Sequence, residues 1–144
     1  MSPSDYVPPW QGEVRPPALP DPEGHFDHLE PGSAAFEAAH VFGSIRRVLD
    51  IWEHYFGRPI EWNFRRHYDR LEVVIIPQLD NALMGYGFMA IGYHHEPSGE
   101  VRPFTLNFDV IAHEVGHGII YSEVGLPTSE TEQGEYFGFH ESAA

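Results

Sequence analysis

A helical pattern of apolar residues begins near residue 33 and runs for more than twenty positions. Apolar side chains that recur every three or four positions fall on one face of a helix, and here they are Val41, Ile45, Val48, Trp52 and Tyr55. Ser33 is suited to cap the start of the helix, and Gly57 followed by Pro59 is a stop signal. The pattern predicts an amphipathic helix of roughly six turns that covers a sheet.

Three runs of apolar and β-branched residues follow this helix. They are "LEVVIIPQL" (71–79), "YGFMAIGYHH" (86–95) and "EVRPFTL" (100–106), and a Pro- and Gly-containing turn at 96–99 separates the last two. We expect these runs to form the strands of a small sheet.

A second helix is predicted after the strands. Asn107 and Asp109 offer caps for its start, and Gly125 with Pro127 ends it. Residues 136–144 have the pattern of the first turns of a third helix. The order of helix, strands and helices indicates an α+β fold.

The N-terminal part of the chain has a different composition. Residues 1–31 contain eight of the 13 prolines, which disfavour helices and central strands. We therefore divide the chain into a proline-rich arm at 1–31 and a folded domain at 32–144.

Composition restricts the classes of partner and the location. The formal net charge is −14 and no basic patch is visible, which argues against nucleic acid and anionic membranes as partners. No apolar run is long enough to cross a bilayer, and the first residues do not resemble a signal peptide. A cytoplasmic location and secretion with the leader removed both stay open. Because the chain has no cysteine, a metal would be held by His, Asp, Glu and backbone oxygens.

The helix at 108–126 contains the pattern His-Glu-x-x-His. His113 and His117 lie four residues apart, which puts their imidazoles on one face, about 40° apart and about 6 Å along the axis. Two nitrogens so placed can bind one tetrahedral cation, and Glu114 can reach a water on it as a general base. A chance match in a chain rich in His and Glu is the alternative. However, the surrounding residues are apolar, and burying three polar groups without a metal would be costly.

Several acidic residues are candidates for the third ligand. Glu123 is rejected because helical geometry turns it about 240° from His117. The acidic residues of the following loop, Glu130, Glu132 and Glu135, have the pattern of a solvated surface. Glu141 belongs to the amphipathic segment "YFGFHES", and from a facing helix it would complete a site with two histidines and one glutamate. His94 and His95 are adjacent on a predicted strand, point to opposite faces and cannot chelate one ion together.

These motifs resemble those of the thermolysin-like gluzincin metallopeptidases. "DVIAHEVGH" is similar to the active-site helix of that family and "HES" to its glutamate helix. The resemblance implies a zincin N-terminal subdomain with a backing helix, a small mixed sheet and the active-site helix. It implies Zn²⁺ held by His113, His117 and Glu141, with Glu114 as the base. "NALMGYG" (81–87) resembles the edge strand that pairs with a peptide substrate, through Asn81 and Ala82.

Two departures from the family affect the expected activity. The family uses a tyrosine to stabilise the developing oxyanion, and the best-matching position here is Thr128. A histidine donor and an orienting aspartate follow the glutamate in the family, whereas this chain ends at Ala144. We therefore expect an N-terminal part of a larger peptidase, truncated on its C-terminal side and weakly active or inactive alone. Asp109 matches a position that binds Ca²⁺ in some members, but its expected partners also lie past Ala144.

The resemblance predicts a zinc-dependent endopeptidase that acts on peptides or proteins through metal-activated water. The alternative is a non-catalytic zinc-binding module that pairs with another chain. An exposed apolar face on the active-site helix would favour a homodimer through the cleft face.

Overall fold

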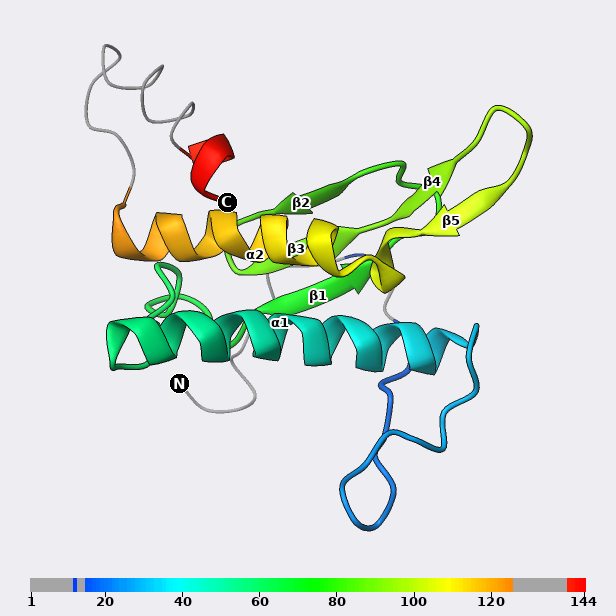
Figure 1. Cartoon of the computed structure of the whole chain (residues 1–144), viewed down its shortest axis with the longest axis horizontal. Coiled ribbons are helices and arrows are strands. Elements are labelled where there is room, and N and C mark those ends of the chain that lie inside the picture. Colours follow the sequence, from blue (N-terminus) through cyan, green and yellow to red (C-terminus); the bar gives the residue numbers. More distant parts are fainter. Residues whose placement is uncertain (1–11, 13–14, 126–139) are drawn as a thin grey trace.

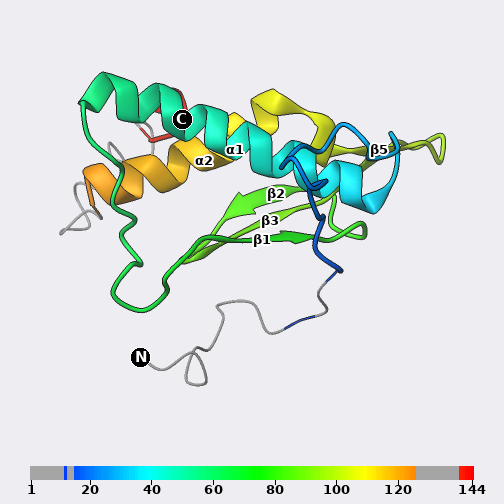
Figure 2. The ribbon, with the colours of Figure 1, turned by 90° about the horizontal axis from the view of Figure 1, so that it is seen from below.

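The computed structural model of the chain describes residues 12, 15–125 and 140–144. Two helices, α1 (Ala34–Phe56) and α2 (Phe108–Glu123), lie on one face of a three-stranded sheet (Figures 1 and 2). The predicted combination of helix and sheet is thus confirmed at the level of an α+β class. Among the described residues, no helix is both long and apolar enough to cross a lipid bilayer.

The three-stranded sheet has the order β1-β3-β2 and places β2 at an edge. β1 (Glu72–Ile75) runs parallel to β3 (Phe88–Ile91), with Val73 opposite Met89. β2 (Ala82–Met84) runs antiparallel to β3, with Leu83 opposite Ala90. The sheet is therefore mixed, as predicted.

A second, two-stranded sheet extends beyond the first as a hairpin. β4 (Tyr93–His95) pairs antiparallel with β5 (Val101–Pro103), and a short 3-10 turn, η2 (Phe104–Leu106), leads from β5 into α2. The predicted strand at 100–106 is thus half strand and half turn, and the predicted strand at 71–79 is shortened to four residues.

Gly92 divides the predicted strand at 86–95 into β3 and β4. A Cβ atom at this position would lie 1.7 Å from the carbonyl oxygen of Leu79, so that only glycine fits. The same carbonyl accepts a hydrogen bond from the amide of Tyr93 (2.8 Å), while the amide of Gly92 donates to the carbonyl of Asn81 (2.9 Å). The backbone around Leu79 can pack directly against Gly92 because glycine has no side chain. The apolar pattern of the segment did not reveal this close contact.

The ends of α1 follow the predicted signals. The hydroxyl of Ser33 accepts a hydrogen bond from the amide of Phe36 (3.1 Å), and Gly57 has the left-handed conformation of a helix C-cap (φ 68°). These contacts satisfy backbone groups that the helix itself leaves unpaired.

The predicted apolar face of α1 is correct in its first half and wrong in its second. Val41, Ile45 and Val48 are buried, but Trp52 is 39% and Tyr55 77% exposed. Beyond Leu49 the aromatic rings contact one another instead of the core, with 5.6 Å between the ring centroids of Trp52 and Phe56.

The described part of the proline-rich arm, residues 15–31, contains no helix or strand. Arg15 lies 3.5 Å from a carboxylate oxygen of Glu37, a buried residue of α1 whose two oxygens both accept from the hydroxyl of Tyr93 at 2.6 Å. The division of the chain at residue 31 stays a prediction. The expected contacts of Tyr6 and Trp10 lie outside the described residues.

The core lies between the two helices and the sheet. α2 contributes Ile111, Val115 and Ile119, which are 0%, 0% and 4% exposed, and β3 contributes Met89 and Ile91, both fully buried. These side chains fix the rotation of α2 about its axis.

Replacing Ile111 with alanine should lower the free energy of unfolding by about 2–5 kcal/mol, because the removed methyl groups leave a cavity in the core. Urea unfolding followed by circular dichroism would measure the change. Val101→Ala is the control, because Val101 is 46% exposed and should change stability by less than about 0.5 kcal/mol. Equal effects of the two substitutions would contradict the placement of the core.

Candidate metal centre

The side chains of His113 and His117 project from the face of α2 that is turned away from the core. Ile111 and Val115 each precede one of these histidines by two residues, or about 200° around the helix, and both are fully buried. Asn107 caps the helix start, where its side-chain oxygen accepts from the amides of Asp109 (3.0 Å) and Val110 (3.3 Å). The apolar pattern therefore determines both where α2 packs and where its histidines point.

Glu141 reaches the two histidines from a separate segment. Residues 140–143 form a helical turn that lies against α2 (Figure 1, red). The Nε2 atom of His113 lies 3.4 Å from one oxygen of Glu141, and the Nε2 atom of His117 lies 3.4 Å from the other. The two Nε2 atoms are 3.0 Å apart. Within the described residues, this is the group of three side chains able to hold a metal ion.

The donor atoms lie close enough together to share one metal ion. Zinc lies about 2.0–2.2 Å from nitrogen and oxygen ligands, so two ligands of a tetrahedral site are about 3.3–3.6 Å apart. Each imidazole Nε2 lies 3.4 Å from a different oxygen of Glu141, which is close to that value, and the two Nε2 atoms are somewhat closer together, at 3.0 Å. With one ligand atom taken from each residue, the three atoms lie within 4.8 Å of one another. The side chain of Glu141 is 68% exposed and that of His117 13% exposed, so the cluster is open to solvent on the glutamate side.

Gly116 allows the turn that carries Glu141 to approach α2. A Cβ atom at Gly116 would lie 2.9 Å from both the Cα and the carbonyl oxygen of Ala144. On another side of the helix, a Cβ at Gly118 would lie 2.2 Å from the terminal methyl group of Met84 in β2. The two glycines thus let two separate segments pack closely on α2, but only the contact at Gly116 is with backbone.

Burial and neighbouring charges change the ionisation of the cluster. Burial lowers the pKa of His117 below its ordinary value, and the nearby His140 lowers it further, whereas Glu141 raises it. The lowered pKa favours the neutral imidazole, which is the form that binds a metal.

Glu114 is shifted in the opposite direction. Burial raises the pKa of its carboxyl group above the ordinary value, and the charge of Glu141 adds to the effect, while His113 and the amide of Met84 lower it. A carboxylate whose proton affinity is raised in this way is suited to accept a proton near neutral pH.

A pocket of about 350 Å³ lies beside His113 and Glu114. Asn81 and Ala82 line its side formed by the edge strand, and Phe104 and Val110 supply apolar walls. The structure therefore brings the two residues predicted from the edge-strand resemblance to the same pocket as the predicted base. The side-chain oxygen of Asn81 accepts from the amide of Ala82 at 2.8 Å.

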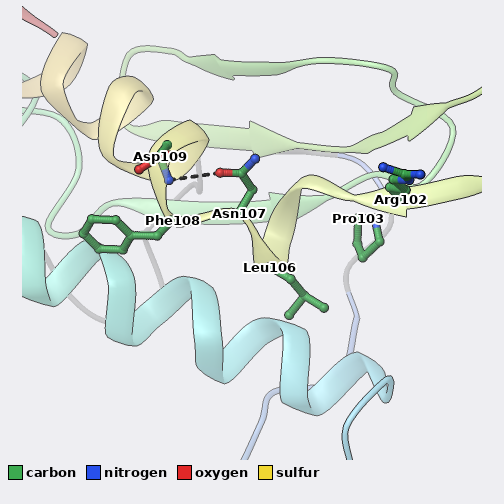
Figure 3. Close-up of a pocket in the computed structure, with 6 residues that line it drawn as sticks. All are labelled: Arg102, Pro103, Leu106, Asn107, Phe108 and Asp109. Carbon is green, nitrogen blue, oxygen red and sulfur yellow. Dashed lines mark hydrogen bonds between the residues drawn. The ribbon is translucent and has the colours of Figure 1, made fainter.

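A second hollow, of about 390 Å³, lies at the start of α2 (Figure 3). Leu106 and Phe108 point toward α1, and Asn107 turns back to the amide of Asp109 (Figure 3). Asp109 is not part of a three-residue group of potential metal ligands among the described residues. The prediction of Ca²⁺ at Asp109 thus gains no further ligand from this part of the chain.

The other candidates for ligands are accounted for in part. Glu123 forms an ion pair with Arg58, whose guanidinium donates to one of its oxygens at 3.1 Å, and it is not in the cluster, as predicted. His94 contacts Asp80 (3.1 Å) and His95 contacts the carbonyl of Pro77 (2.9 Å), both on the exposed hairpin. Four further residues named from the sequence lie outside the described residues: Thr128, Glu130, Glu132 and Glu135.

His140 is a site residue that the sequence analysis missed. It is 2% exposed, its Nδ1 atom is hydrogen-bonded to Nδ1 of His117, and its ring stacks on that of His117 with 4.6 Å between centroids. Its position directly before Glu141 was the only signal in the sequence.

No family model, no curated protein and no solved structure matches this chain. The interpretation of the site therefore depends on its own residues and geometry.

Gly116→Ala should weaken binding of Zn²⁺ by about tenfold or more, because the added methyl group collides with backbone and displaces the turn that carries Glu141. Gly118→Ala is the matched control: it makes the same change two residues away, and the flexible end of Met84 can move aside. Competition with a chromophoric chelator would give both affinities. Equal affinities of the two variants would show that the close approach at Gly116 does not position Glu141.

Glu114→Gln should stabilise the metal-free chain at neutral pH. Below the ordinary carboxyl pKa of 4.5, Glu114 is protonated in the folded and unfolded states alike. As the pH rises through the higher pKa of the folded state, the fold must hold a buried charge and wild type loses stability. The stability advantage of the glutamine variant should therefore grow between pH 4.5 and neutrality. Urea unfolding with EDTA would measure it, with the exposed Glu30→Gln as control; an advantage that does not change with pH would refute the prediction.

Proposed function

We propose that this chain is a zinc-dependent endopeptidase of the thermolysin-like kind. The observation that carries the proposal is the cluster of His113, His117 and Glu141, in which the two Nε2 atoms are 3.0 Å apart and each lies 3.4 Å from an oxygen of the Glu141 carboxylate. Its chemistry points to zinc, because two imidazoles and one carboxylate with an accessible fourth side are the ligands of catalytic zinc sites. The chain has no cysteine to form the thiolate sites typical of structural zinc.

The position of Glu114 supports a hydrolytic rather than a purely structural site. It lines the pocket beside His113, and its pKa is raised by burial. Zinc, when bound, supplies a water of lowered pKa and polarises a carbonyl group. Glu114 would accept the proton of that water on a carboxylate oxygen and then deliver it to the nitrogen of the leaving amine.

The edge strand supports a peptide or protein as the substrate. Among the strands of the described residues, β2 pairs only with β3, so an extended peptide could add to its other side through main-chain hydrogen bonds. Asn81 and Ala82 lie at the start of this strand and line the pocket with Glu114. A peptide added there would have its scissile bond beside the base.

The alternative is a zinc-binding module without activity that pairs with another chain, including a second copy of itself. Phe108 and Val124, at the two ends of α2, are 42% and 60% exposed. Their exposure is the observation in favour of such a partner.

The metal content of the purified chain is the first test. We expect one zinc per chain by atomic emission after dialysis, and a clear loss of affinity in Glu141→Ala, because that substitution removes one of three ligands. Glu123→Ala is the control, since Glu123 pairs with Arg58 away from the cluster. A chain without zinc, or one whose affinity is the same in both variants, would contradict the proposed site.

Glu114→Gln tests the catalytic part of the proposal. The zinc-loaded wild type should hydrolyse a quenched fluorescent peptide slowly, and the variant should lose this activity by about a hundredfold or more while it retains zinc. Casein cleavage followed on a gel would provide a second substrate. Zinc binding with equal turnover in both proteins would show that Glu114 is not the base, and zinc binding without turnover in either protein would favour the non-catalytic module.

A further inference from the structure

His140 occupies a buried position behind the cluster rather than in it. Its ring lies over two residues that are one turn apart on α2: it stacks on His117 at an interplanar angle of 20° and contacts Tyr121 with 4.4 Å between the ring centroids. At 2% exposure it is among the most buried polar side chains of the described residues. Because the next residue is Glu141, the packing of His140 also determines where that carboxylate lies.

The two nitrogens of His117 face different partners. Nε2 lies 3.0 Å from Nε2 of His113 and 3.4 Å from Glu141, whereas Nδ1 is hydrogen-bonded to Nδ1 of His140. A metal ion in the cluster would therefore take the lone pair of Nε2. The proton of the neutral ring must then be on Nδ1, which needs an acceptor.

We propose that His140 is the residue that positions His117 for metal binding, by accepting the Nδ1 proton of His117 on its own Nδ1 atom. This inference rests on the proposed zinc site and extends it. His140 must then carry its own proton on Nε2. The metal ion thus determines the tautomer of His117, and the hydrogen bond from His117 determines that of His140. A metal-binding histidine whose other nitrogen is held in this way has a fixed ring orientation and is a more basic ligand.

Two substitutions separate the hydrogen bond from the packing. His140→Asn keeps an acceptor, because its side-chain oxygen can occupy the place of Nδ1, but it loses the ring that stacks on His117 and contacts Tyr121. His140→Phe keeps an aromatic ring of similar size and has no acceptor. If His140 acts through the hydrogen bond, the affinity for Zn²⁺ should fall by about 10- to 100-fold in the phenylalanine variant and stay close to wild type in the asparagine variant.

The controls address folding and the surface. His95→Phe makes the same change on the exposed hairpin and should leave the affinity unchanged. Urea unfolding in EDTA would measure the stability of every variant without metal. The absorption spectrum of the Co²⁺-substituted proteins would report the ligand geometry, which should change in His140→Phe and not in His140→Asn.

Nitrogen NMR of the wild type tests the same inference without any substitution. Long-range ¹H–¹⁵N spectra of the zinc-loaded chain should show His117 protonated on Nδ1 and His140 protonated on Nε2. A His140 ring protonated on Nδ1 would overturn the inference, as would equal zinc affinities of wild type and His140→Phe. If His140→Asn bound Zn²⁺ more weakly than His140→Phe, the ring of His140 would act through packing alone. That result would also overturn the inference. Failure of the wild type to bind zinc would instead refute the proposed function itself.

Discussion

The structure depends on how α2 is packed between α1 and the sheet. Ile111, Val115 and Ile119 recur every four residues and are almost completely buried, so the hydrophobic effect fixes the helix at one rotation about its axis. The polar face of the helix then has no freedom of its own. His113 and His117 point away from the core because Ile111, Val115 and Ile119, on the opposite face of α2, must point into it. Burial of the apolar face of α2 therefore determines where the two histidines lie, and their polar contacts then adjust the positions of the side chains.

Much of the fold could be predicted from local patterns. The caps at Ser33 and Asn107 and the glycine at residue 57 are short-range signals, and the structure uses all three. Longer-range contacts were predicted less well. The apolar periodicity of α1 continues to Tyr55, but the core does not extend that far, so its last turns are exposed. The close contact at Gly92 is with the carbonyl oxygen of Leu79, which belongs to another segment of the chain, and no periodicity in the sequence indicates it.

The same distinction applies to the candidate site. The spacing of His113, Glu114 and His117 on one helix is a local property, and it was sufficient to predict that the two imidazoles would converge. Glu141 was predicted from an amphipathic segment together with the resemblance, and the structure brings its carboxylate to 3.4 Å from both imidazoles. His140 and Gly116 were not predicted, because their roles arise from contact between segments more than twenty residues apart. Before the fold is known, a buried histidine and an exposed one have the same sequence signature.

The junction at Gly92 has a consequence for how the molecule can be modified. Two hydrogen bonds there connect the hairpin to the segment before β2: Tyr93 to Leu79, and Gly92 to Asn81. A change at this junction would therefore be transmitted to the edge strand β2. The far end of the hairpin is different, because residues 97–102 are exposed and their nearest backbone contacts are with the hairpin itself. A fluorophore, an affinity tag or an inserted loop at Ser98 would project into solvent and leave the edge strand and the histidine cluster as they are.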